Sequence, residues 1–145
     1  MTINSIEDVG FLMDKLGIPY SFDEDKTSIF TYIVNEGETP TSIMMDIVGN
    51  HWLYVSAILL TEKPVTEDEK LCLFYKSLLI ENNYTKMGRF FIDEEGGIRF
   101  GTDLLLSTVN EELLEASIST ILYAVENRLP EIGAPYVDLL FSTST

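Results

Sequence analysis

The feature that most constrains the fold is a pair of strand-like segments separated by only two turn residues. Residues 42–48 alternate, with Ile43, Met45 and Ile47 on one face, and residues 51–60 are again strand-like. Gly49-Asn50 between them is a hairpin signal in which glycine takes the first turn position. A connection this short joins antiparallel neighbours, so the sequence predicts an antiparallel sheet.

Further strand segments lie on both sides of this hairpin. Residues 27–34 are rich in Thr, Ile, Tyr and Phe, and residues 36–40 have the composition of a turn. Residues 87–93 and 98–106 are predicted to form a second hairpin around Glu94-Glu95-Gly96-Gly97.

Three segments have helical patterns. Ser5 and Asp8 resemble a capping box at the start of the first helix, which Gly17 and Pro19 end. Thr66 and Glu69 form the same pattern at the start of the second. Its expected buried stripe is Leu71, Phe74, Tyr75, Leu78 and Leu79. The last helix is expected from residue 108 or 110 to about Leu129, with a stripe from Leu114 to Leu129, and Pro130 closes it.

The element order is therefore α-β-β-β-α-β-β-α, an α+β fold with a mainly antiparallel sheet and helices on one face. We expect a single domain over residues 5–130. Residues 131–145 form a C-terminal tail with an apolar patch that includes Leu140 and Phe141. Such a tail docks on the body of the domain, packs on a partner subunit, or frays.

Charge excludes several classes of partner. The 145 residues include 9 Lys and Arg against 24 Asp and Glu, a formal charge of −15. A field of this sign repels phosphate, so neither nucleic acid nor an anionic membrane surface is an expected partner. No apolar run approaches the ~20 residues of a membrane span. Because the N-terminal sequence also lacks a signal-peptide pattern, we expect a cytoplasmic protein.

The residues that usually carry catalysis are scarce. His51 is the only histidine and lacks a nucleophile motif around it, so we interpret it as a strand-start residue. Cys72 lies beside Leu71, Leu73 and acidic Glu69, which favours an inert core residue. No phosphate-binding glycine motif is present. We therefore expect no enzyme activity and no cofactor.

Acidic clusters offer equally weak metal sites. Asp23-Glu24-Asp25 lacks the glycine and the final glutamate of a calcium loop, and one histidine with one cysteine cannot build a zinc site without several carboxylates. Asp93-Glu94-Glu95 is expected at a hairpin tip with its side chains in water. We predict solvated turns at both places and no metal.

Adjacent large apolar residues on strands indicate binding instead. Alternation sends Phe90 and Phe91 to opposite faces of the sheet, and likewise Met44 and Met45. If helices cover only one face, one member of each pair is exposed, and exposed aromatic and methionine side chains in a group mark protein interfaces. The alternative is that the terminal helices and the tail cover both faces.

Three segments carry a resemblance to a known family. They are Leu78-Leu79-Ile80-Glu81-Asn82-Asn83, then Met87-Gly88-Arg89-Phe90-Phe91-Ile92-Asp93, then Gly97-Ile98-Arg99-Phe100. They resemble the YbjN-like family of bacterial sensory-transduction regulators and look like type III secretion chaperones, over roughly residues 5–130. The resemblance implies small acidic proteins that dimerise and, among the secretion chaperones, bind extended client segments on apolar patches. It implies no catalytic residues.

The leading hypothesis is a non-enzymatic protein-binding module, chaperone-like or regulatory, that acts as a homodimer. Its expected apolar contacts are Phe91, Met44, Leu140 and Phe141. One alternative is a small-molecule-sensing regulator with a pocket between sheet and helices. Another is a hydrolase built on carboxylates alone, which would need a carboxyl group of strongly raised pKa in a cleft.

Overall fold

The computed structural model describes residues 2–34, 40–61 and 67–136. Six strands form one antiparallel sheet in the order β1-β2-β3-β4-β6-β5. Their bounds are β1 Ser21–Phe22, β2 Ser28–Ile33, β3 Thr41–Val48, β4 Trp52–Leu60, β5 Arg89–Ile92 and β6 Ile98–Leu105. The predicted α+β fold with a mainly antiparallel sheet is confirmed. Strand β1 was not predicted, because two residues are too few to show alternation.

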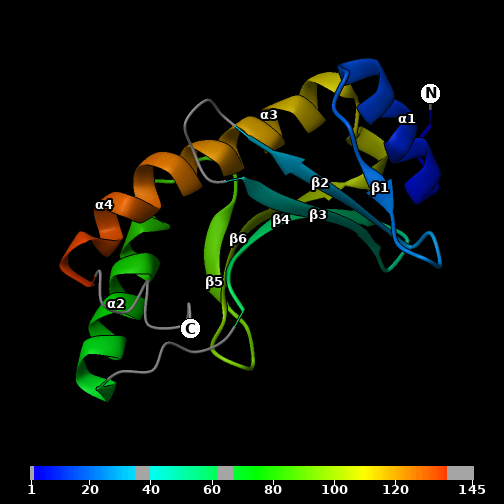
Figure 1. Cartoon of the computed structure of the whole chain (residues 1–145). Helices are drawn as coiled ribbons and strands as arrows, with labels where there is room; N and C mark the ends of the chain where they lie inside the picture. The colour runs from blue at the N-terminus through cyan, green and yellow to red at the C-terminus, as the bar shows by residue number, and fades with distance from the viewer. Residues whose placement is uncertain (1, 35–39, 62–66, 137–145) are drawn as a thin grey trace.

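The helices are α1 Ile6–Leu16, α2 Asp68–Glu81, α3 Glu111–Tyr123 and the short α4 Leu129–Gly133. Single 3₁₀ turns occupy Leu106–Thr108 and Ala134–Tyr136. Figure 1 shows the sheet strongly bent, with α3 along the outside of the bend and α2 and α4 beyond the β5 edge. No described helix lies inside the bend.

The two ends of α1 form as the sequence predicts. The Ser5 side chain accepts a hydrogen bond from the Asp8 N–H, and the Asp8 carboxylate accepts from the N–H of Asn4 and Ser5. Gly17 ends the helix in the left-handed region, at φ 70°. The buried face of α1 contacts α3 and the sheet.

Helix α2 differs from its prediction in two respects. Its N-cap is Glu67, whose side chain makes no capping hydrogen bond, while the predicted cap Thr66 lies outside the described residues. Leu71, Phe74 and Leu78 are buried, but Leu79 is 60% exposed. Adjacent helical residues are turned 100° from each other, so Leu78 and Leu79 do not share one narrow stripe.

Helical structure does not end at Pro130, which corrects a second prediction. The predicted stripe of α3 packs on the core, and Ala124–Arg128 continues as a π-helix in which the Leu129 N–H donates to the Ala124 carbonyl. Pro130 lies in the first turn of α4, where its missing N–H is tolerated. The chain is helical through Tyr136, whose ring lies 5.5 Å from that of Phe74.

The β3–β4 turn has the predicted position and a different type. Both Gly49 (φ 61°) and Asn50 (φ 59°) have positive φ, whereas a turn of the glycine-first type needs it only at the first residue. The predicted turn at residues 36–40 has only Pro40 among the described residues.

Candidate functional site

The sheet has one face that no described helix covers. Alternation places Ile29, Met45, Val55 and Phe100 in the core against the helices. The opposite side chains of the same strands lie inside the bend seen in Figure 1. We call this surface the open face. It carries Phe30, Tyr32, Met44, Val48, Trp52, Tyr54, Ile58, Phe91 and Leu105.

The two predicted contact residues that the structure describes both lie on the open face. Phe90 is buried at 2% exposure and Phe91 is half-buried on the opposite face. Met45 is fully buried, while Met44 is half-buried. β3 and β5 are separated by β4 and β6, so Met44 and Phe91 lie about 14 Å apart across the strands. Leu140 and Phe141 lie outside the described residues.

The centre of the open face is built around Gly101. Gly101 is paired with Ser56 on one side and Arg89 on the other. The rings of Tyr54 and Phe91 approach to 5.7 Å between centroids, and both Ser56 and Gly101 are buried. Arg89 lies over the Phe91 ring at 5.5 Å and pairs with Asp103 at 3.0 Å. Phe91 is therefore held in place by neighbours on both sides.

Three buried polar atoms near this centre belong to neighbouring side chains but make no well-formed hydrogen bond within the described residues. They are Tyr54 Oη, Ser56 Oγ and Arg99 Nε. Arg99 Nε lies 3.7 Å from Asp93 Oδ2, which is an ion-pair distance and too long for a hydrogen bond. Burial raises the pKa of Tyr54 above its ordinary value near 10, and a tyrosine hydroxyl is protonated at neutral pH even without this shift, so it can donate. Buried polar atoms of this kind favour a partner that brings hydrogen-bonding groups.

The end of the open face near the β3–β4 turn is more exposed. Trp52 pairs with Val48 and Leu105, and the three side chains are 45%, 52% and 43% exposed. A hollow of about 220 Å³ lies between Val48, Trp52 and Asp103. Three adjoining large apolar side chains that reach solvent are more than the scattered exposure expected of a monomer.

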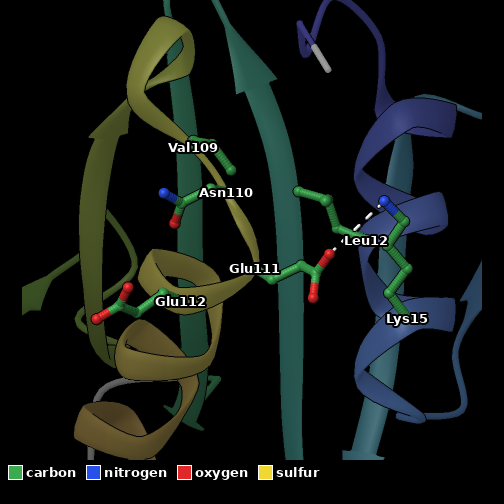
Figure 2. Close-up of a pocket in the computed structure, with 6 residues that line it drawn as sticks. All are labelled: Leu12, Lys15, Val109, Asn110, Glu111 and Glu112. Atoms are coloured by element: carbon green, nitrogen blue, oxygen red, sulfur yellow. Dashed lines mark ion pairs between the residues drawn. The ribbon is translucent and has the colours of Figure 1, made fainter.

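A second surface is the groove between α1 and α3. Figure 2 shows Glu111 of α3 reaching toward Lys15 of α1, with Leu12 projecting from α1 toward α3 beside them and Glu112 pointing away. The Lys15–Glu111 ion pair is 3.6 Å long. The hollow lined by Leu12 and Lys15 has a volume of about 310 Å³, and a second hollow of about 450 Å³ extends from Leu16 to Tyr32 and Leu122. Glu115 borders it, so this groove is apolar at its base and acidic at its edge.

A third surface is the outer side of α2. Cys72 is exposed there, so the prediction that it is a core residue is wrong. It follows Leu71 by one residue and is thereby turned away from the buried stripe. Leu73, Leu79 and Ile80 are also exposed and, with Cys72, flank Lys76 on one side of the helix. We call these four apolar residues the α2 stripe.

The acidic turns use their carboxylates internally. Asp93 accepts hydrogen bonds from the N–H of Glu95 and Gly97, which corrects the expectation that its side chain points into water. Asp23 accepts from Thr27 and Ser28. His51 is exposed in the turn before β4. In the described ranges, no three histidine, cysteine or carboxylate side chains gather as metal ligands would.

Sequence reasoning missed the α2 stripe and the role of Gly101. The α2 sequence has apolar residues on its outer side as well as its buried side, so the periodicity that located Leu71, Phe74 and Leu78 did not reveal the exposed apolar residues. In the sequence Gly101 looks like any other glycine in a strand, because the contact between the Tyr54 and Phe91 rings is visible only in the structure. Within the described residues, none of the helices has both the length and the apolar character needed to cross a bilayer.

No protein-family model and no curated protein sequence matches the chain. Solved structures are similar to it. A chain in the crystal structure of the ExsC–ExsE complex is 17% identical, with TM-score 0.56, over 87% of this chain and 92% of its own length. A chain of the HopA1–SchA chaperone–effector complex is 11% identical, with TM-score 0.56, and the similarity covers 83% and 91%.

A third similar structure is the heterodimeric ExoU–SpcU complex of the type III secretion system of Pseudomonas aeruginosa. One of its chains is 10% identical, with TM-score 0.59, and the similarity covers 84% of this chain and 94% of that chain. The resemblance to the YbjN-like family stays a prediction, since no family model supports it. The likeness at this level of identity shows the fold: the chain is a single α+β domain with a six-stranded antiparallel sheet, similar in fold to chains of these complexes.

Proposed function

We propose that this protein is a non-enzymatic, chaperone-like binding module that holds a segment of a client protein. The observation that carries the proposal is the open face, where aromatic and aliphatic side chains of five strands have no described covering element. A one-sided antiparallel sheet normally presents polar residues to water, so an apolar outer face indicates a partner. Similarity to chains of a chaperone–effector complex supports the same function.

The contacts of this face suit a client with both apolar and polar groups. Trp52 and Phe91 supply apolar area, and Phe91 is already held between Tyr54 and Arg89. A rigid aromatic residue loses little conformational freedom when a partner binds. Tyr54 and Ser56 supply hydrogen-bonding atoms that make no well-formed hydrogen bond within the described residues. Met44 is proposed as a further contact because a flexible thioether adapts to different clients.

The charge favours a basic client. A formal charge of −15 attracts cationic segments and keeps a protein with exposed apolar patches in solution. Leu140 and Phe141 of the tail are proposed as additional apolar contacts. We place the protein in the cytoplasm, and a regulatory role of the YbjN-like kind remains compatible with the same binding surface.

The protein is proposed to act as a homodimer through the α2 stripe. Leu73 and Ile80 are seven residues apart, as are Cys72 and Leu79, so the stripe repeats after two helical turns. A two-fold axis near Lys76 would place each end of the stripe against the opposite end in the second copy.

The client proposal is tested by affinity capture from the cell lysate of the source organism. The tagged full chain and a Trp52→Ser variant are compared at low and high salt, and bound proteins are identified by mass spectrometry. We expect a near-stoichiometric partner with the unchanged chain, depleted at least about tenfold with Trp52→Ser, because truncating a large aromatic contact in an interface costs ~2 kcal/mol or more. Phe91→Ser is a second variant, with its fold checked by circular dichroism.

Phe11→Ser is the matched control. Phe11 is an aromatic residue with 53% exposure on α1, away from the open face. Capture that is lost equally with Phe11→Ser would mean that the client does not use the open face. Recovery of the bare protein alone would remove the client-binding function.

A further inference from the structure

The strongest unassigned feature is a cavity of about 260 Å³ between the end of α3, strand β6 and the loop before β5. Its floor is formed by Phe100, which is fully buried, and by Ala124, which is 3% exposed. Tyr84 and Tyr123 stand at its mouth with exposed rings. An apolar floor with aromatic walls is the usual lining of a small-molecule site.

The charges around this cavity are opposite to those of the whole chain. Lys86 and Arg128 line it, and no acidic residue does, although acidic residues outnumber basic ones by 24 to 9. By contrast, the grooves beside α1 and α3 are bordered by Glu111, Glu112 and Glu115, and the hollow at Trp52 by Asp103.

The two basic residues differ in what they already bind. Arg128 donates to both carboxylate oxygens of the buried Glu81, at 2.5 and 2.9 Å, and to Glu131 at 2.6 Å. The Glu81 carboxylate raises the pKa of Arg128 above its usual value. Arg128 is thus fixed in place with its charge compensated. Lys86 has no ion pair within the described part of the chain, so its ammonium group is the cation that a ligand would meet.

The walls of the cavity are held in place before any ligand arrives. The Thr85 hydroxyl donates to the Gly88 carbonyl at 2.7 Å and lies 3.2 Å from the Asn82 carbonyl. The Asn82 side chain accepts from the backbone N–H of Phe90 and donates to its carbonyl. In the floor, the π-helical turn fixes Ala124, whose side chain is only a methyl group. A preformed cavity binds without a cost for ordering its walls.

We propose that this cavity binds a small organic anion, with a single ring or short apolar chain on Phe100 and Ala124 and a carboxylate at Lys86. The volume lies just below the range of drug-sized sites, which limits the ligand to about one ring with a short substituent. The site is separate from the open face and does not depend on the client-binding proposal. The cavity is a candidate for the pocket between sheet and helices that the small-molecule-sensing alternative requires.

The test uses two probes that differ only in charge, 3-phenylpropionate and 3-phenylpropanamide. Each is titrated into the ¹⁵N-labelled full chain at pH 7 and followed by amide chemical shifts. We expect saturable shifts at Tyr123 and Ala124 with both, and an affinity about three- to fivefold higher for the carboxylate, because an exposed charge pair contributes at most ~1 kcal/mol. Lys86→Gln should reduce the carboxylate affinity to that of the amide.

Ala124→Leu should abolish binding of both probes, since the larger side chain fills the floor. If that variant does not fold, Tyr123→Ala is used, because Tyr123 is 59% exposed and outside the core; it should weaken both probes. Lys26→Gln, at the opposite edge of the sheet, removes the same charge and should change nothing. Absence of saturable shifts at millimolar probe, or shifts that Ala124→Leu leaves intact, would overturn the site. Equal affinity for the two probes would contradict the proposal that the ligand is an anion.

Discussion

Asp23 illustrates what a single acidic side chain contributes in this chain. Its carboxylate accepts hydrogen bonds from the Thr27 hydroxyl at 2.6 Å and from the N–H groups of Thr27 and Ser28 at 2.7 and 2.9 Å. These bonds close the turn between β1 and β2. The Thr27 hydroxyl, followed by the backbone donors, lowers the pKa of Asp23 below its ordinary value of 3.8.

Replacing Asp23 by Asn should therefore destabilise the protein in a pH-dependent way. A carboxyl whose pKa is lowered by folding stabilises the folded state above its unfolded-state pKa, and this contribution disappears as pH falls through the lower folded value. We expect Asp23→Asn to lower the free energy of unfolding at pH 7, and the difference to shrink below about pH 3.8. Urea unfolding of both proteins at pH 7 and at a pH below 3.8 measures this difference in the free energy of unfolding. Asp25→Asn is the control in the same turn, and an equal effect of both variants would contradict the argument.

Among the elements, β6 depends on the absence of a side chain at one position. A Cβ built on Gly101 would lie 2.7 Å from the Val55 carbonyl oxygen and 2.8 Å from Ser56 Cβ, which are contacts with a neighbouring strand. Two strands cannot separate locally without loss of their hydrogen bonds. The glycine thus sets how closely β4 and β6 pair beneath the Tyr54–Phe91 rings.

Gly101→Ala should destabilise the fold by about 1–3 kcal/mol, the usual cost of overpacking a close contact. Chemical denaturation followed by far-UV circular dichroism measures the change. Ser42→Ala, also on the open face but on β3, serves as the comparison and should alter the stability little. A Gly101→Ala protein as stable as the unchanged chain would mean that the two strands adjust freely.

The elements that could be predicted from sequence are those with a local signal. Period-two alternation located β3 and assigned Met44 and Met45 to opposite faces. Strand-like composition and turn residues located β2, β4, β5 and β6, and the capping box located α1. In α2 the periodicity correctly located the buried residues Leu71, Phe74 and Leu78, but apolar residues also occur on the outer side of the helix, so Leu79 was assigned to the wrong side. The cavity at Ala124 could not be predicted, because its walls come from three distant parts of the sequence and from a π-helical turn.

The molecule as a whole combines a strongly acidic surface with an apolar α2 stripe that is unpaired in the described part of one copy. Like-charged copies repel at long range, but salt screens this repulsion over about 8 Å at physiological ionic strength. A stripe of apolar side chains can then bring two copies together.

We expect light scattering after gel filtration to give about twice 16.4 kDa for the unchanged protein. Leu79→Glu should give the monomer mass, because it places a charge at 60% exposed Leu79 in the stripe. Leu105→Glu makes the same change on the open face and should leave the dimer intact. If Leu105→Glu gives the monomer mass and Leu79→Glu does not, the dimer interface lies on the open face. If the unchanged protein is itself a monomer, the homodimer proposal is wrong.

The strand order also determines how the chain finds its fold. Strands β1 to β4 pair with sequence neighbours, and so do β5 and β6, so both groups form through local contacts. Only the pairing of β4 with β6 joins residues 52–60 to 98–105, across the whole of α2. Closing that loop lowers the entropy of the chain before the contacts between β4 and β6 can stabilise it. We therefore expect the β4–β6 seam to set the folding rate, and the two halves of the sheet to become ordered separately before they join.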